Sequence, residues 1–281
     1  MVLEKNFVIT RSNEKPILYD VSYIEDKSLK PIVVFCHGYK GFKDWGAWRL
    51  VAESFAKEGF FFLKFNFSHN GGTIEQPIDF PDLKAFGQNN FSKELIDLEN
   101  IISELSSNNE FEKEIDIKNI SLIGHSRGGG IVLIKAEEDP KINNVITWAG
   151  VCDFKVRFQE NSETFKQWEK SGITFVENGR TKQQMPHDFQ FYKDFKTNEN
   201  RLTIRRAVEN LNANLLIIHG SEDTSVTVLE AQNLHQWNSK STLEIIENAD
   251  HVFGASHPWC NSELPPDLNK AIMQTVAFIK K

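Results

Sequence analysis

The sequence predicts an α/β protein with a doubly wound, mostly parallel sheet of eight strands. Short apolar runs alternate along the chain with longer segments that carry one apolar helical face. Most of the later runs are apolar throughout, which is typical of parallel strands that helices cover on both faces. Strands that alternate with helices indicate a doubly wound sheet, and 281 residues are enough for one large core.

Eight segments are expected to form this sheet, within a single domain that spans residues 1–281. Residues 7–10 and 17–23 should form an opening hairpin, because the second run has the alternation of a strand. The other six strands are expected at 32–36, 60–65, 120–123, 145–148, 215–218 and 243–246.

Helices are expected around these strands, at 46–58, 92–106, 127–137, 228–237 and 266–280. In the second helix, leucine and isoleucine recur from Leu95 to Leu105 at helical spacing and give a clear apolar face. Asp97 should then lie on the solvent side of this helix.

The alternation of strand and helix stops between residues 152 and 205, where the sequence is rich in aromatic and charged residues. A structureless loop of this length is unusual in a compact domain, so we expect helices here and a hairpin near Gly179. The segment leaves the carboxyl end of a strand, where open α/β sheets bind ligands. We therefore expect a cap, with loop 67–90 as a second pocket wall. Most aromatic residues of the segment should anchor it and one or two should line the pocket; they are Phe154, Phe158, Phe165, Trp168, Phe175, Phe189, Phe191, Tyr192 and Phe195.

The sequence G-H-S-R-G at 124–128 follows an expected strand and precedes an expected helix. In that context G-x-S-x-G forms a nucleophile elbow, a strained turn that exposes the serine hydroxyl above the sheet. Glycine is needed at 124 and 128 because a Cβ there would clash with the neighbouring helix and strand. Ser126 is therefore the candidate nucleophile, and the backbone N–H of Arg127 should point toward the same space.

A second glycine-rich loop, H-G-Y-K-G at 37–41, follows the expected strand 32–36. A tetrahedral oxyanion needs two convergent hydrogen-bond donors. The backbone N–H groups of Tyr39 and Arg127 are the candidate oxyanion hole, because Gly38 and Gly41 allow the tight loop that aims the first of them. His37 is expected to brace this loop.

Two loops that follow later strands supply a candidate acid and a candidate base. Asp223 and its neighbour Glu222 follow the strand at 215–218. His251 lies after the last strand and before the last helix, as suits a base that must reach the serine and be oriented by an acid. His257 is the alternative base. Asp250 ranks below Asp223, because it is adjacent to His251 and side chains of adjacent residues point apart.

The chain order of serine, acid and histidine resembles that of the α/β-hydrolase superfamily, since unrelated serine hydrolases use other orders. The resemblance spans nearly the whole chain, and its G-x-x-D-x-x-V spacing favours Asp223 over Glu222. The motifs at 37–41 and 124–128 are similar to those of the bacterial cinnamoyl (feruloyl) esterases and dienelactone-hydrolase-like proteins. Dienelactone hydrolases proper use a cysteine nucleophile, so Ser126 argues against that activity.

The resemblance implies a serine hydrolase that cleaves carboxylic esters of small or medium substrates through an acyl-enzyme, without a cofactor. Three alternatives remain open. One is a peptidase or amidase with the same triad, and another is a cofactor-free haloperoxidase or C–C hydrolase. The third is a catalytically silent binding protein on this fold, although such proteins usually lack a triad residue and none is missing here.

The resemblance implies a small-molecule ester substrate, and the composition argues against other classes of partner. A net charge of −7 argues against nucleic acid or an anionic membrane surface as partner, and no stretch approaches the ~20 apolar residues of a membrane span. Residues 1–6 lack the apolar core of a signal peptide, and three widely spaced cysteines suggest free thiols, so we expect a cytoplasmic protein. No C-x-x-C or H-E-x-x-H pattern predicts a metal site. Acyl and alcohol specificity and oligomeric state have no readable signature.

Overall fold

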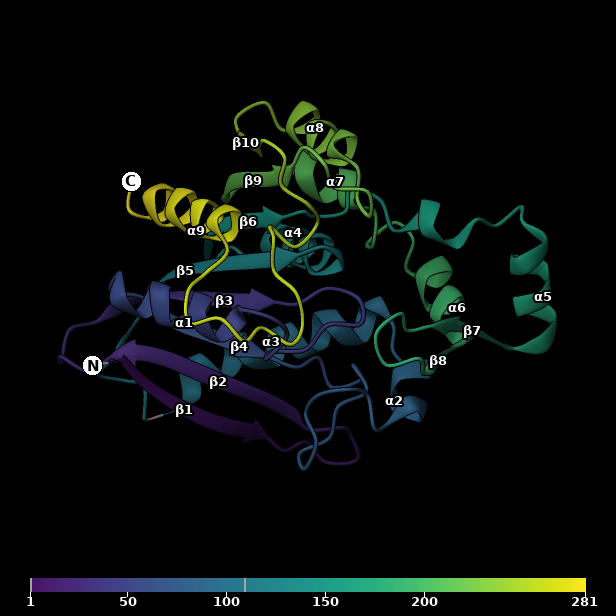
Figure 1. Ribbon diagram of the computed structural model, residues 1–281, viewed down its shortest axis with the longest axis horizontal. Coiled ribbons are helices and arrows are strands. Elements are labelled where there is room, and N and C mark those ends of the chain that lie inside the picture. Colours follow the sequence, from purple (N-terminus) through teal and green to yellow (C-terminus); the bar gives the residue numbers. More distant parts are fainter. Residues whose placement is uncertain (1, 109) are drawn as a thin grey trace.

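The structure is a computed structural model that describes residues 2–108 and 110–281; Met1 and Asn109 of the expected domain lie outside the described residues. Within that part of the chain, eight strands form the central sheet in the order β1-β2-β4-β3-β5-β6-β9-β10 (Figure 1). The strands are β1 (Val2–Ile9), β2 (Ile17–Ile24), β3 (Lys30–Cys36), β4 (Phe61–Phe65), β5 (Ile115–His125), β6 (Ile142–Trp148), β9 (Asn214–Gly220) and β10 (Thr242–Ile246).

Strand β2 runs antiparallel to β1 and β4, and the other neighbours in the sheet pair in parallel. The predicted eight-stranded, mostly parallel sheet is therefore confirmed. Its central strands β3, β5 and β6 are buried along most of their length because helices cover both faces of the sheet.

The expected helices appear as α1 (Trp48–Lys57), α3 (Phe91–Ser107), α4 (Arg127–Glu138), α8 (Val228–Trp237) and α9 (Pro266–Ile279). Helices α1 and α9 bury their apolar residues against one face of the sheet. Helices α3, α4 and α8 bury theirs against the other face. Two short helices, α2 (Leu83–Gly87) and α7 (Ile204–Glu209), were not predicted, because five or six residues are too few to show a helical period.

The predicted solvent position of Asp97 is wrong. Its carboxylate is buried on α3, where it accepts hydrogen bonds from the backbone N–H and hydroxyl of Ser68 and pairs with Arg11 at 3.0 Å. Burial raises the pKa of Asp97 to about 6, although the Ser68 hydrogen bonds and the Arg11 charge oppose that shift. Helical periodicity did not reveal this site because two distant segments of the chain cover the polar side of α3.

Residues 152–205, here called the insert, lie between β6 and β9 and have secondary structure of their own. They contain a 3-10 turn (Lys155–Phe158), α5 (Glu163–Ser171), the antiparallel strands β7 (Ile173–Glu177) and β8 (Gln184–Asp188), and α6 (Gln190–Thr197). The turn between β7 and β8 includes Gly179, so the expected hairpin is present. Figure 1 shows the insert extending beyond the end of the sheet toward which the arrows of β3 and β9 point.

Candidate active site

Ser126 occupies a strained turn between β5 and α4. Its backbone has φ 56° and ψ −120°, a region that residues with a side chain rarely adopt. Glycine is required on both sides, because a Cβ at Gly124 would lie 2.3 Å from the carbonyl oxygen of Gly128. A Cβ at Gly128 would lie 2.4 Å from the carbonyl oxygen of Cys36. Helix α4 and strand β3 can therefore approach the turn this closely only because positions 124 and 128 are glycine.

Three of the sequence-predicted side chains form one hydrogen-bonded chain. Ser126 Oγ lies 3.0 Å from His251 Nε2, and His251 Nδ1 lies 2.7 Å from Asp223 Oδ2. The topology explains why Asp223 and His251 lie close together. Asp223 follows β9 and His251 follows β10, and the carboxyl ends of these parallel, neighbouring strands lie at the same edge of the sheet. In this geometry the imidazole can donate from Nδ1 to the carboxylate and accept from the serine hydroxyl at Nε2.

The Asp223 carboxylate is buried and held by its own loop. Its Oδ1 accepts hydrogen bonds from the backbone N–H groups of Ser225 and Val226, each at 2.8 Å. Burial alone would raise the pKa of Asp223, but hydrogen bonds from His219, His251 and Val226 outweigh it and lower the pKa below the ordinary value. The carboxylate therefore stays charged next to the imidazole.

The alternative acids and the alternative base point elsewhere. Glu222 is exposed, and Asp250 Oδ1 accepts hydrogen bonds from the backbone N–H groups of Val252 and Gly254. His257 accepts a hydrogen bond from the Gly46 N–H through Nδ1 at 2.9 Å and packs edge-on against Phe42. These contacts leave Asp223 and His251 as the pair that meets Ser126.

A further histidine braces the loop of His251. His125, the residue before Ser126, lies with Nε2 2.9 Å from the carbonyl oxygen of His251 and is buried. Burial lowers the pKa of His125 to about 3, and the nearby His251 adds to that shift. A neutral His125 can donate this hydrogen bond. The sequence did not single out this contact, because it joins two loops that are far apart in the chain.

The loop at 37–41 lies directly against the serine. A Cβ at Gly38 would lie 2.8 Å from the Cβ of Ser126, so only glycine allows this approach. His37 braces the loop as expected: its Nδ1 donates to the Gly38 carbonyl oxygen at 2.9 Å, and its Nε2 accepts from the Phe67 N–H at 3.3 Å. Burial lowers the pKa of His37 to about 4, which keeps the ring neutral.

The two expected backbone donors are free to bind a ligand. Among the described residues, neither the N–H of Tyr39 nor that of Arg127 donates to a protein acceptor. Arg127 is the first residue of α4, where backbone N–H groups have no acceptor within the helix and the helix dipole favours negative charge. The structure therefore leaves two unused donors near the serine, one in the loop at 37–41 and one at the start of α4.

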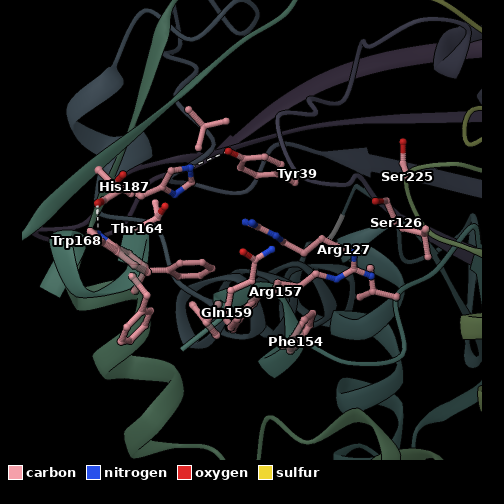
Figure 2. Close-up of a pocket in the computed structure, with 18 of the residues that line it drawn as sticks. Tyr39, Ser126, Arg127, Phe154, Arg157, Gln159, Thr164, Trp168, His187 and Ser225 are labelled. Atoms are coloured by element: carbon pink, nitrogen blue, oxygen red, sulfur yellow. Dashed lines mark hydrogen bonds between the residues drawn. The ribbon is translucent and has the colours of Figure 1, made fainter. Parts of the chain in front are cut away.

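A cavity of about 600 Å³ opens beside Ser126 and His251 (Figure 2). The insert supplies most of its lining, including Phe154, Phe158, Phe165, Trp168 and Phe191. The prediction that one or two aromatic residues of the insert reach the pocket is therefore wrong: five do. These lining residues also pack against each other, so anchoring and lining are not separate roles.

The predicted second pocket wall from loop 67–90 is also wrong. No residue of that loop lines the cavity in the described part of the chain, where Phe91, at the start of α3, is the neighbouring lining residue. The apolar side chains of the loop are used elsewhere, since Phe80 and Phe86 pack with Phe42 and Met185 in a separate small core.

A second cavity of about 440 Å³ also reaches the serine and has a mostly different lining. Tyr39, Ser126 and His251 line both cavities, and His257 lines only the second one. A substrate bound across Ser126 would therefore have one space for each side of its reacting group.

His187, which sequence reasoning did not single out, also lines the larger cavity. Its Nε2 lies 2.7 Å from the hydroxyl of Tyr39, and its carbonyl oxygen accepts from Trp168 Nε1. Burial lowers the pKa of His187 to about 3, and the charge of Arg127 adds to the shift. The alternation of Met185 and His187 in β8 is the sequence signal that could have placed this side chain on the inner face of the hairpin.

A family model described as the alpha/beta hydrolase fold matches residues 31–181, more than half of the chain. The chain therefore belongs to the alpha/beta hydrolase fold family. The matched region contains Ser126, Tyr39 and Arg127 but ends before Asp223 and His251. The meeting of those two residues with the serine is thus a separate observation that depends on the geometry alone.

Solved structures share the fold at low sequence identity. A putative hydrolase from Agrobacterium vitis has a TM-score of 0.72 and 16% identity, with 99% of each chain covered. Est1E from Butyrivibrio proteoclasticus has a TM-score of 0.72 and 12% identity, with 98% of each chain covered. A putative dienelactone hydrolase from Klebsiella pneumoniae subsp. pneumoniae has a TM-score of 0.63 and 15% identity, covering 100% of this chain and 99% of that one.

No curated protein matches the sequence significantly. Within residues 2–108 and 110–281, none of the helices combines the length and the apolar character needed to cross a membrane.

Proposed function

We propose that the protein is a serine ester hydrolase whose nucleophile is Ser126, whose general base is His251 and whose orienting acid is Asp223. The observation that carries the proposal is the hydrogen-bonded chain from Ser126 Oγ through His251 to Asp223, at 3.0 and 2.7 Å. A serine hydroxyl is a weak nucleophile unless a positioned base takes its proton, and the base needs a third group to fix its tautomer.

In the first half of the reaction, Ser126 Oγ attacks the ester carbonyl carbon and its proton moves to His251 Nε2. The imidazolium that forms is stabilised by the Asp223 carboxylate, which the low pKa of Asp223 keeps charged. His251 then protonates the leaving alcohol oxygen, and an acyl-enzyme on Ser126 results. His251 then takes a proton from water as the water oxygen attacks the acyl carbon, and it returns that proton to Ser126 Oγ as the bond to the acyl carbon breaks and the acid leaves.

The backbone N–H groups of Tyr39 and Arg127 form the oxyanion hole in this proposal. Both are free of protein acceptors among the described residues; Tyr39 belongs to the loop that touches Ser126, and Arg127 follows Ser126 at the start of α4. Preorganised donors of this kind stabilise the negative charge that develops on the carbonyl oxygen, and each contributes roughly 3–4 kcal/mol to transition-state stabilisation. The N-terminal position of Arg127 in α4 adds the favourable end of the helix dipole.

The insert acts as a cap that selects the substrate. It supplies most of the lining of the larger cavity, and the aromatic side chains favour an apolar or aromatic group on one side of the ester. The second cavity receives the group on the other side of the ester. Names of the structural relatives, such as a putative dienelactone hydrolase, agree with ester cleavage but do not define the substrate of this chain.

A panel of p-nitrophenyl esters of increasing acyl length, with methyl ferulate and an aminoacyl nitroanilide alongside, tests this function. We expect ester hydrolysis by the wild-type protein and loss of about 10⁴-fold or more in kcat for Ser126→Ala. Preferential cleavage of the anilide would instead identify an amidase. A Ser126→Ala variant that retains a tenth of the wild-type rate would exclude Ser126 as the nucleophile.

A further inference from the structure

The side chain of Arg127 places a positive charge inside the larger cavity. Figure 2 shows it extending away from Ser126 into the cavity, toward Tyr39 and His187. Its guanidinium carbon lies 4.5 Å from the ring centre of Tyr39, 5.3 Å from that of Phe191 and 5.5 Å from that of Phe91. Three aromatic faces thus hold the cation in place without neutralising it.

The guanidinium has hydrogen-bonding capacity to spare. In the described part of the chain, its single protein contact of this kind is from Nη1 to Glu94 Oε1, at a long 3.5 Å. Glu94 Oε1 already accepts a shorter hydrogen bond of 2.7 Å from Asn89. Burial raises the pKa of Glu94, which weakens it as a counter-ion. A guanidinium carries five N–H donors in a fork that fits a carboxylate, so most donors of Arg127 remain available to a ligand.

The rest of the cavity offers no competing acid. No aspartate or glutamate lines either cavity within the described residues, although the chain as a whole has a net charge of −7. Arg157 also lines the larger cavity, but its guanidinium pairs with the carboxylate of Glu230. Arg127 is therefore the cation of this cavity that is best placed to bind an anion, and the low dielectric of an aromatic pocket strengthens such a pairing.

We propose that the substrate is an ester that carries a carboxylate, bound by the Arg127 side chain within the larger cavity. This inference rests on the proposed function, because it names the substrate class of the same site. The carboxylate can belong to the acyl part, as in a dicarboxylic acid monoester, or to the alcohol part, as in an ester of a hydroxy acid. Recognition is the same in both cases, namely a forked, charge-assisted contact between guanidinium and carboxylate.

Matched pairs of esters that differ only in charge test the proposal. For the acyl part, mono-p-nitrophenyl adipate is compared with the p-nitrophenyl ester of adipic acid monoamide. For the alcohol part, para-acetoxybenzoate is compared with para-acetoxybenzamide. The quantity measured is the ratio of kcat/KM for the carboxylate to kcat/KM for the amide, after subtraction of the uncatalysed rates.

We expect this ratio to exceed one in the wild-type protein for at least one pair, which also assigns the carboxylate to the acyl or alcohol side. Arg127→Met should lower the ratio by about 10- to 100-fold, the usual worth of a hydrogen bond to a charged group. Because Arg127 also supplies a backbone N–H, both rates can change, and only the ratio isolates the side chain. Arg157→Met is the matched control, and the ratio should change by less than about threefold because Glu230 already neutralises that cation.

Ratios at or below one for both pairs in the wild-type protein would overturn the proposal without any variant. The test therefore does not depend on whether Arg127→Met folds. An equal fall of the ratio in Arg157→Met would also contradict the role of Arg127. Fluorophosphonate labelling of Ser126, measured in parallel, distinguishes failure of the substrate class from failure of the proposed function. A labelled protein that prefers amides refutes only the substrate class, whereas a protein that does not label refutes the proposed function itself.

Discussion

Asp223 Oδ2 lies 2.7 Å from His251 Nδ1, and the same oxygen lies 3.3 Å from Nε2 of the buried His219. His219 Nε2 is also 2.7 Å from the carbonyl oxygen of Val226, to which it can donate. The carboxylate is therefore set between two imidazoles and the backbone of its own loop. This arrangement fixes the direction from which Asp223 meets His251.

Asp223→Asn should lower kcat for ester hydrolysis by about 10³- to 10⁴-fold, because an amide in this position favours the wrong tautomer of His251. Steady-state kinetics with a p-nitrophenyl ester measures the effect. Glu222→Gln is the matched control, since Glu222 is adjacent but exposed, and it should keep nearly the wild-type rate. The reverse result, a slow Glu222→Gln and a fast Asp223→Asn, would transfer the role of the acid to Glu222.

His251→Ala should cost about 10⁴-fold or more in kcat, because it removes the group that accepts the Ser126 proton. His257→Ala should have a small effect on kcat, because His257 bonds to the Gly46 N–H and packs on Phe42. The two variants are compared in the same ester assay. An inactive His257→Ala beside an active His251→Ala would reverse the assignment of the base.

Phe158→Ala should change KM and acyl-length preference and lower the free energy of unfolding by about 3–5 kcal/mol. Phe158 is 8% exposed, lines the cavity and packs against Phe191 and Phe195. Phe175→Ala is the control within the same insert, because that side chain is 54% exposed, and it should alter stability by less than about 0.5 kcal/mol. Denaturant unfolding and the ester panel measure both effects. Unchanged acyl-length preference in Phe158→Ala would argue against the insert as the selecting element.

His37→Asn should destabilise the protein less at pH 5 than at pH 7. Burial lowers the pKa of His37 to about 4 in the folded protein, whereas an unfolded histidine titrates near about 6.5. Between these two pKa values the unfolded chain binds a proton that the folded protein does not. The contribution of the neutral His37 side chain to stability is therefore lost as pH falls from about 6.5 toward 4. The difference between the two pH values should reach about 2 kcal/mol. Denaturant unfolding of both proteins measures it, and equal destabilisation at both pH values would show that His37 titrates normally.

The sequence was sufficient for the features that depend on local pattern. Most strands of the sheet could be predicted because they contain a short apolar run between turns, although β1 and β5 begin five residues before the expected runs, in segments of mixed polarity. Ser126 could be predicted because the elbow needs glycines at fixed spacing. Features that depend on distant contacts were missed. Burial of Asp97 results from the approach of Ser68 and Arg11, and the position of His187 results from the way the insert hairpin folds over Tyr39.

The most direct test of the account is fluorophosphonate labelling followed by peptide mass spectrometry of the wild-type protein and Ser126→Ala. The account predicts a single adduct on Ser126 in the wild-type protein, because its hydroxyl is hydrogen-bonded to His251 and faces both cavities. It predicts no adduct in Ser126→Ala, with the far-ultraviolet circular dichroism spectrum unchanged. A wild-type protein that stays unlabelled, or an adduct that persists in Ser126→Ala, would contradict the assignment of Ser126 as the activated nucleophile.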